Sequence, residues 1–334
     1  DEFRRNLQAG LKRFASGFLK TAGIVTPPAN PYLLQMGVTG GDFQKLKQSL
    51  LADLTVKDVD LEKGQVPGDV DILVLLAPKE LSTKALVAVD QFVMQGGTVI
   101  AATSPVAVEF KDNKLVASRQ KSGLEDWLQH MGIKIAGSVV MDPQNASFPV
   151  PVTHNVGGYN FQEMRMLDYP YFIDLREGLS AQNAITSDLG QLTMAWASPI
   201  QLDPDKDGKR RVTRLLSSSA RSWVSDSLDI MPRVSRNGAE PFPAADTRNS
   251  NLLGVVVEGQ FSSFFKDKAS PLLLGDEAKD DKENKEQAEA YAAVVNHSPD
   301  SARIIIFSSN EFLQDQTVSL LTSAQGATYL NAFQ

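Results

Sequence analysis

The sequence predicts an α/β fold with an open, mainly parallel sheet flanked by helices. Residues 71–78 and 97–103 are two apolar runs of the kind found in strands that helices cover on both faces. Residues 82–96, between them, have the apolar spacing of an amphipathic helix. A strand, a helix and a strand in this order predict a right-handed parallel crossover, the unit from which such sheets are built.

The same alternation of helix and strand extends toward the start of the chain. Asp42 is expected to cap a helix whose apolar face begins at Phe43. Ser82 is the expected N-cap of the central helix, and Gly96 is expected to end that helix in a left-handed conformation. The other elements expected here are a helix at 2–19 and strands at 21–26 and 54–61.

Beyond the central crossover the pattern becomes richer in strands. A hairpin is expected around residues 111–114, followed by a helix that opens with a capping box at Ser122 and Glu125. Residues 303–308 form a further buried strand, which is expected to rejoin the main sheet. Other strands or β-rich runs are expected at 138–141, 169–175, 192–202, 210–217 and 252–260.

These patterns divide the chain into three parts. Residues 1–145 are the first part of the α/β core, residues 146–300 a β-rich insertion or second subdomain, and residues 301–334 a return to the core. Within the insertion, residues 266–290 are strongly charged and poor in apolar side chains, which predicts a mobile surface loop.

The composition excludes several classes of function. A net charge of −7 without a basic run argues against a nucleic-acid partner, because phosphate binding needs clustered Lys and Arg. The absence of cysteine removes thiol nucleophiles, disulfides and thiolate metal sites. The three histidines occur in unrelated contexts, so neither a metal nor a cofactor is expected. No apolar run approaches the roughly 20 residues that span a bilayer, and both ends look like those of an excised fragment.

Three motif-like features lack groups that the corresponding chemistry requires. Residues 37–42 have neither the glycine spacing nor the lysine of a phosphate-binding loop, which favours a flexible loop ending in a helix cap. Residues 203–208 open like a calcium loop, but Arg214 occupies the position of the closing carboxylate, which favours a polar hairpin turn between residues 194–203 and 210–219. No Gly-x-Ser-x-Gly elbow occurs. The sequence therefore predicts no catalytic residues.

The remaining candidate site is the edge of the sheet where the parallel strands end, because open α/β sheets bind ligands there. Lys79 and Ser104 follow two of the expected strands, and Asn310 follows the returning strand. Arg221 and Trp223 lie two residues apart near a serine-rich turn, which suits a sugar or a peptide. These five residues are the candidate ligand-binding contacts. The alternative is that they only cap strands and pack.

Several separate segments also resemble those of one protein family. They are DILVLLAPK and LSTKALVAVDQFVMQGG in residues 71–97, MAWASPI in 194–200, TRLLSSS with RSW in 213–223, and SSNEFLQD in 308–315. In their order they resemble the extracytoplasmic auxiliary component of GldG-type ABC transporters. That family is associated with gliding motility and is related to a domain of intraflagellar transport proteins.

The resemblance implies a flavodoxin-like core similar to class I glutamine amidotransferases, whose chemistry requires the cysteine that this chain lacks. It also implies a periplasmic domain on the outer side of the inner membrane. The tethering transmembrane helices would be missing from this sequence, which would stop just before one of them. An ABC permease and an ATPase are the implied partners.

We therefore expect a non-enzymatic auxiliary domain that recognises a transporter partner, an envelope component such as a glycan or peptide, or an exported substrate. Two alternatives remain open. One is a degenerate or unrecognised hydrolase that acts on envelope glycans or peptides. The other is a structural spacer without a pocket.

Overall fold

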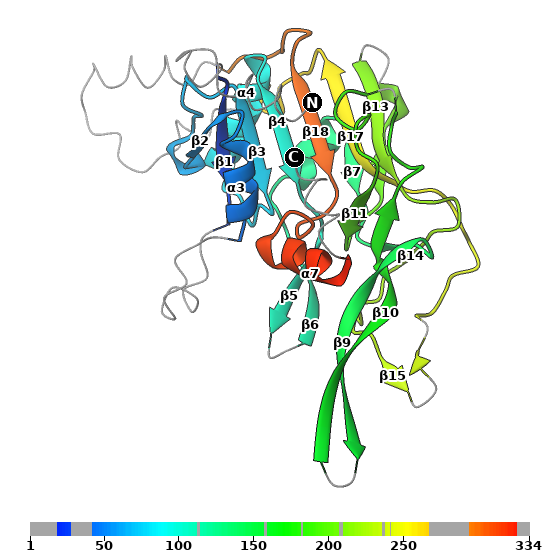
Figure 1. Cartoon of the computed structure of the whole chain (residues 1–334). Helices are drawn as coiled ribbons and strands as arrows, with labels where there is room; N and C mark the ends of the chain where they lie inside the picture. Colours follow the sequence, from blue (N-terminus) through cyan, green and yellow to red (C-terminus); the bar gives the residue numbers. More distant parts are fainter. Residues whose placement is uncertain are drawn as a thin grey trace.

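A nine-stranded sheet forms the centre of the protein, with helices on both of its faces (Figure 1). Its strands follow the order β2-β1-β3-β4-β18-β17-β12-β7, and β13 pairs with β17 beside this path. The predicted α/β class is confirmed. The computed structural model describes residues 19–27, 42–111, 114–156, 159–181, 183–206, 210–235, 238–240, 242–266 and 294–325.

The first half of the sheet is parallel, as predicted. β1 lies between β2 and β3, β4 pairs with β3, and β18 pairs with β4, all in parallel orientation. The strand that returns late in the chain therefore rejoins the main sheet, as expected. The bounds of these strands are β1 Thr21–Val25, β2 Thr55–Asp58, β3 Ile72–Leu76, β4 Thr98–Ala102 and β18 Arg303–Phe307.

The central crossover consists of β3, α4 (Thr83–Met94) and β4. Ser82 Oγ accepts a hydrogen bond from the Ala85 N–H at 3.1 Å, which makes Ser82 the N-cap. Gly96 follows the helix with φ of 91°, a conformation that glycine adopts at little cost. Local sequence signals predicted both ends of this helix correctly.

The second half of the sheet is antiparallel, which apolar patterning alone did not reveal. β17 pairs with β18, β12 and β13, and β12 pairs with β7. No described pairing joins β12 to β13, so the hairpin predicted around residues 203–208 is wrong: both strands pair with β17 instead. Residues 146–300 thus contribute strands to the main sheet, and the division of the chain at residues 145 and 300 stays a prediction. The bounds are β7 Ile133–Ile135, β12 Ile200–Leu202, β13 Arg210–Ser217 and β17 Leu252–Gly259.

Alternate residues of β3 face two separate cores, because side chains alternate across a strand. Leu73 and Leu75 pack in the core beneath α4 and α5 (Glu125–His130). Val74 and Leu76 pack in a second core that includes residues of α3 (Gln44–Leu50) and α7 (Asp315–Gln325). The sheet is therefore covered on both sides, as its apolar strands require.

Asp42 does not cap α3, contrary to the prediction. Phe43 occupies the N-cap position and provides no side-chain hydrogen bond. The carboxyl group of Asp315, at the start of α7, accepts hydrogen bonds from the N–H groups of Gln44 and Lys45, each at 2.8 Å. The cap thus comes from a side chain remote in sequence, which local spacing does not reveal.

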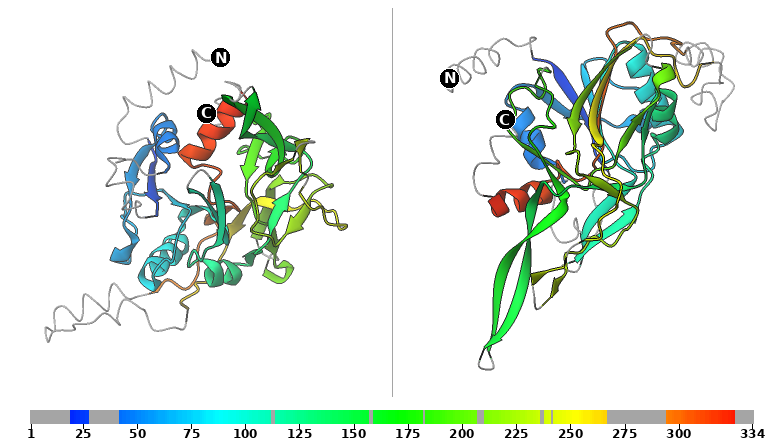
Figure 2. Two further views of the ribbon diagram at one scale, coloured as in Figure 1. Left: turned by 90° about the horizontal axis from the view of Figure 1, so that it is seen from below. Right: turned by 90° about the vertical axis from the view of Figure 1, so that its right-hand side faces the viewer.

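The longest strands form a hairpin that extends away from the sheet (Figures 1 and 2). β9 (Asn145–Val156) and β10 (Tyr159–Leu175) pair along most of their length, and β11 (Leu192–Ala195) pairs with the base of β10. We call residues 149–156 and 159–166 the β9–β10 arm. The distal part of the arm extends beyond the two hydrophobic cores, so packing in these cores does not explain why the two strands are so long.

Short elements complete the described structure. The predicted hairpin at 111–114 joins β5 to β6. Glu125 accepts the Ser122 N–H bond of the predicted capping box, although α5 starts only at Glu125. Residues 2–18, 37–41 and 267–290 lie outside the described residues. The short elements are η1 Leu61–Lys63, β5 Val106–Lys111, β6 Lys114–Arg119, β8 Val139–Met141, η2 Pro204–Lys206, β14 Trp223–Ser225, β15 Val234–Ser235 and β16 Gly238–Ala239.

Candidate functional site

Ser104 and Asn310 meet at the end of the parallel strands, where the sequence places them. The Ser104 N–H donates to Asn310 Oδ1 at 3.0 Å, and Asn310 Nδ2 donates to the carbonyls of Ser104 and Val106, each at 2.8 Å. Ser104 Oγ lies 3.0 Å from Ser198 Oγ. Both predicted residues are buried. Their polar groups are therefore engaged inside the protein.

This buried network joins the main sheet to the β9–β10–β11 sheet. The Ser198 N–H donates to the Ser308 carbonyl at 2.9 Å, and Ser309 Oγ donates to the Ala195 carbonyl at 2.6 Å. Trp196, where the chain leaves β11 for β12, is fully buried with φ of 49°, a conformation that is unfavourable for a bulky residue. The segments 194–200 and 308–315 thus meet in a structural junction.

We expect Asn310→Ala to lower the free energy of unfolding by about 2–3 kcal/mol, because a buried N–H and two buried carbonyls lose their partner. Chemical denaturation measures the change. Asn296→Ala is the matched control: Asn296 is exposed, so its loss should change stability by less than about 0.5 kcal/mol. Equal effects of the two substitutions would contradict a structural role for Asn310.

A pocket of about 200 Å³ lies beside this junction. The carboxyl group of Glu125 already accepts hydrogen bonds from the N–H groups of Ser122 and Gly123, at 2.7 and 3.0 Å. Lys79 is exposed and does not line the pocket. The pocket is lined by Thr103, Ser104, Pro105, Ser122, Glu125, Leu128, Gln129, Lys134 and Ile135. Of the predicted contacts, only Ser104 reaches it.

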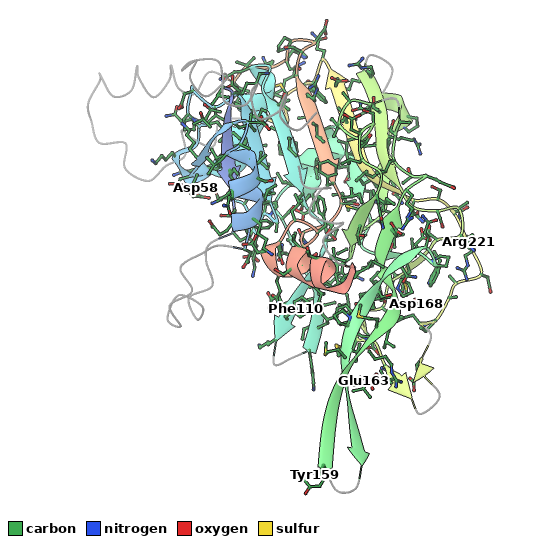
Figure 3. All side chains as sticks on the ribbon, in the orientation of Figure 1. Asp58, Phe110, Tyr159, Glu163, Asp168 and Arg221 are labelled. Carbon is green, nitrogen blue, oxygen red and sulfur yellow. The ribbon has the colours of Figure 1, made fainter. Side chains whose placement is uncertain are left out.

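Arg221 and Trp223 belong to a different part of the molecule, along β14. The Trp223 indole N–H donates to the Pro243 carbonyl at 3.1 Å, and the guanidinium of Arg248 lies 4.3 Å from the centre of its ring. One face of the ring is therefore already covered. Arg221 is exposed, as Figure 3 shows, and its carbonyl accepts from Arg248 Nη1 at 2.9 Å.

Asp142 holds the serine-rich turn that precedes Arg221. Its buried carboxyl group accepts hydrogen bonds from the Ser219 N–H and hydroxyl, each at 2.7 Å, and from the Gln144 N–H at 2.9 Å. The predicted site residues thus form two separate groups, Ser104 with Asn310 and Arg221 with Trp223. No described contact joins the two groups, and Lys79 belongs to neither.

Sequence analysis missed the role of one buried carboxyl group, that of Asp90 on α4. It accepts from Trp127 Nε1 and the Phe264 N–H, each at 3.0 Å, and from Ser263 Oγ at 2.6 Å. The position of this acidic residue within the apolar face of α4 could have indicated a buried carboxyl group.

Glu311 is a second buried carboxyl group. Its Oε1 accepts from the Val108 N–H at 2.8 Å, while Oε2 has no partner among the described residues. Burial raises the pKa of Glu311 to about 8. Within the described parts of the chain, no group of three or more acidic or histidine side chains could hold a metal ion.

The two most exposed large apolar side chains among the described residues, Tyr159 and Met164, lie on the β9–β10 arm. Tyr159, Met164 and Met166 are 74%, 59% and 43% exposed. Figure 3 shows Tyr159 at the far end of the arm. The two methionines share one face of β10, and their partners on β9 are Pro151 and Pro149. Prolines discourage the addition of a further strand to the β9 edge of the arm. Tyr159, Met164 and Met166 are therefore the side chains that we consider as its contact surface.

These features define a mixed α/β protein with a large sheet, parallel in its first half, and a projecting β-arm. The family described as an ABC-type uncharacterized transport system matches residues 18–333, and the chain belongs to this family. It is thereby assigned to the auxiliary components of ABC-type transport systems. Among the described residues, no helix combines the length and apolar character needed to cross a bilayer.

A protein of Borreliella burgdorferi, described as an uncharacterized protein, is 24% identical to this chain over 226 residues. The match covers 65% of this chain and 41% of that protein, so the chain spans less than half of its relative.

Two solved structures have a partly similar outline. The mmIFT52 N-terminal domain has a TM-score of 0.44 and 8% identity, with 91% of both chains covered. A ThuA-like protein from Bacteroides uniformis has a TM-score of 0.36 and 13% identity, with 92% of this chain and 89% of that chain covered. Likenesses of this size support no conclusion, and the flavodoxin-like or amidotransferase-like assignment stays a prediction.

Proposed function

We propose that this chain is a non-enzymatic auxiliary subunit of an ABC-type transport system, and that it docks on the transporter's permease through the β9–β10 arm. The observation that carries the proposal is the exposure of Tyr159, Met164 and Met166 on a hairpin that extends beyond the protein core. Methionine and tyrosine are enriched in protein interfaces. Family membership supplies the class of partner.

The chemistry at the sheet edge also favours binding over catalysis. A hydrolase needs an acid or base that a substrate can reach in an open cleft. Glu311 has a raised pKa, yet its side chain is buried and does not line the pocket beside Ser104. Ser104 and Asn310 are bonded to each other, so neither offers a free group to a substrate.

The finer assignment follows the resemblance to GldG-type components. In this proposal the domain works on the extracytoplasmic side of the inner membrane, is tethered by transmembrane helices, and assembles with the permease and the ATPase. A role in gliding motility belongs to the same proposal. Its support is the family of the chain together with the GldG-like order of its sequence segments.

Replacing Met164 and Met166 together by aspartate should reduce co-purification of the permease with the full-length protein by at least about tenfold. Each substitution puts a carboxylate where an apolar contact would be buried, and a loss of about 1.4 kcal/mol already lowers affinity tenfold. Affinity purification from membranes with quantitative immunoblotting measures the change. Both side chains are exposed, so thermal stability should not change.

Leu51→Asp is the matched control, since Leu51 is 55% exposed at the end of α3. It should leave co-purification intact. Undiminished recovery of the permease with the arm variant would exclude the arm as the docking surface. Recovery of neither permease nor ATPase with the unaltered protein would contradict the transporter partnership itself.

A further inference from the structure

A pocket near the base of the arm contains a buried hydroxyl group that has no hydrogen-bond partner among the described residues. It lies between β10, β14 and the segment after β14, and has a volume of about 270 Å³. We call it the Tyr171 pocket. Its lining includes Tyr171, Phe242, Met231, Asp229, Arg233 and Glu240. This volume is below that of a cofactor site and suits a single side chain.

Tyr171 and its neighbour Tyr169 differ in the hydrogen bonds of their hydroxyl groups. The Tyr169 hydroxyl donates to the Ile230 carbonyl at 2.8 Å and accepts from Trp196 Nε1 at 3.1 Å. The Tyr171 side chain is only 1% exposed, yet its hydroxyl makes no hydrogen bond to any described residue. The fully buried polar side-chain atoms that lack a partner among the described residues are Glu311 Oε2 and Thr317 Oγ1. The Tyr171 hydroxyl is not one of them, so we infer that it is accessible from the pocket that Tyr171 lines.

A buried tyrosine hydroxyl normally has a hydrogen-bond partner. Burial, and secondarily the carboxylate of Asp229, raises the pKa of Tyr171 to about 12. The hydroxyl therefore stays protonated and offers both an O–H donor and an acceptor oxygen. Tyr171 and Asp229 both line the pocket.

The remaining lining favours a cation with an apolar stem. The rings of Tyr171 and Phe242 stand at 87° with their centres 5.2 Å apart, and Met231 adds a polarisable side chain. Asp229 pairs with Arg233, and Glu240 forms no ion pair with a described residue, so the described lining of the pocket has a net negative charge. Aromatic faces beside carboxylates attract ammonium or guanidinium groups, whereas an acidic side chain would be repelled.

We propose that the Tyr171 pocket receives one lysine or arginine side chain of the protein that docks on this domain. The aliphatic stem packs against the aromatic and methionine side chains, and the cationic end hydrogen-bonds to the Tyr171 hydroxyl near Asp229 and Glu240. The assignment of this side chain to a transporter partner rests on the proposed function. The preference for a basic side chain rests on the pocket alone.

Methyl NMR of the full chain tests the pocket without the transporter. Met141 and Met231 line the pocket, and Met164 and Met166 on the arm serve as internal controls. The probes are the capped tripeptides Ala-Lys-Ala, Ala-Arg-Ala, Ala-norleucine-Ala and Ala-Glu-Ala. The basic peptides should shift only the Met141 and Met231 methyl signals, in a saturable manner, and the other two should not.

Tyr171→Phe should weaken binding of the basic peptides about tenfold, because the bound cation loses one hydrogen bond. The same substitution should leave the melting temperature unchanged, since the Tyr171 hydroxyl bonds to no described residue. Tyr169→Phe should lower the melting temperature, because its hydroxyl holds Ile230 and Trp196. This pair separates loss of the binding group from loss of structure.

Equal shifts with the norleucine or glutamate peptide, or no shift with any peptide, would overturn the pocket assignment. Shifts of Met141 and Met231 that depend on protein concentration without peptide would mean that a second copy of the chain fills the pocket. If the basic peptides bind but Tyr171→Phe does not change co-purification of the permease, the pocket binds basic side chains, and its occupant is not a side chain of the transporter. Failure of the arm variant to reduce co-purification leaves the peptide result unaffected.

Discussion

Asp90→Ala is expected to lower the free energy of unfolding by about 3–5 kcal/mol, which is a large part of the stability of a typical domain. The substitution leaves the Trp127 indole N–H buried without an acceptor among the described residues, which costs about 1–3 kcal/mol, and it removes one acceptor of the Phe264 N–H. It also removes the acceptor of Ser263 Oγ. The effect is large because Asp90 connects α4, α5 and the segment after β17.

Chemical denaturation of the full chain measures this loss. Asp53→Ala is the control, since Asp53 is exposed and its removal should change stability by less than about 0.5 kcal/mol. Combining Asp90→Ala with Trp127→Phe should cost less than the sum of the two single changes, because the unpaired indole N–H is then absent. Strict additivity would show that Asp90 and Trp127 do not depend on each other.

Glu311→Gln is expected to remove a marked pH dependence of stability. The pKa of Glu311 is about 8 in the folded protein, chiefly because burial disfavours its charged form, and the reference value is 4.5. Between these values the folded state binds more protons than the unfolded state, so stability falls as pH rises. The fall is up to about 1.4 kcal/mol per pH unit across this window.

The glutamine variant keeps an oxygen for the Val108 N–H and carries no titrating group, so it should lack this slope. Its stability relative to the unaltered protein should therefore increase by about 3 kcal/mol between about pH 5 and about pH 7.5. Urea denaturation across this range provides the measurement. Parallel stability curves for the two proteins would show that Glu311 does not hold a proton in the folded state.

Several parts of the fold could be predicted because their signals are local. The apolar runs of β3 and β4, the Ser82 N-cap and Gly96 define one strand–helix–strand unit within about thirty residues, and the structure confirms each of them. Patterning also located β18 and its return to the sheet. The antiparallel orientation of β7, β12, β13 and β17 escaped prediction, because apolar patterning does not encode the direction of a strand. β17, for example, is buried on both faces along most of its length, and such a strand looks the same in either direction.

The candidate site was predicted only in part, for a related reason. The ends of parallel strands meet at one edge, so Ser104 and Asn310 could be expected to lie close together although they are 206 residues apart. Local spacing did not reveal that the Asn310 side chain would bond to the Ser104 backbone, or that Ser198, between β11 and β12, would contact the Ser104 hydroxyl. The sequence also did not reveal the partner of Trp223, because the Arg248 guanidinium that covers its ring comes from a separate loop.

The sequence by itself determined the α/β class, the central crossover and the lack of thiol chemistry, because each depends on residue type or on neighbours along the chain. Only the tertiary structure decided that Asp315 caps α3 and that Asp90 and Glu311 are buried with different partners. The tertiary structure also decided that the Tyr171 hydroxyl has no partner among the described residues and that the methionines of the β9–β10 arm are exposed. Burial and hydrogen bonding between remote segments depend on how the sheets pack, and no local spacing encodes that packing.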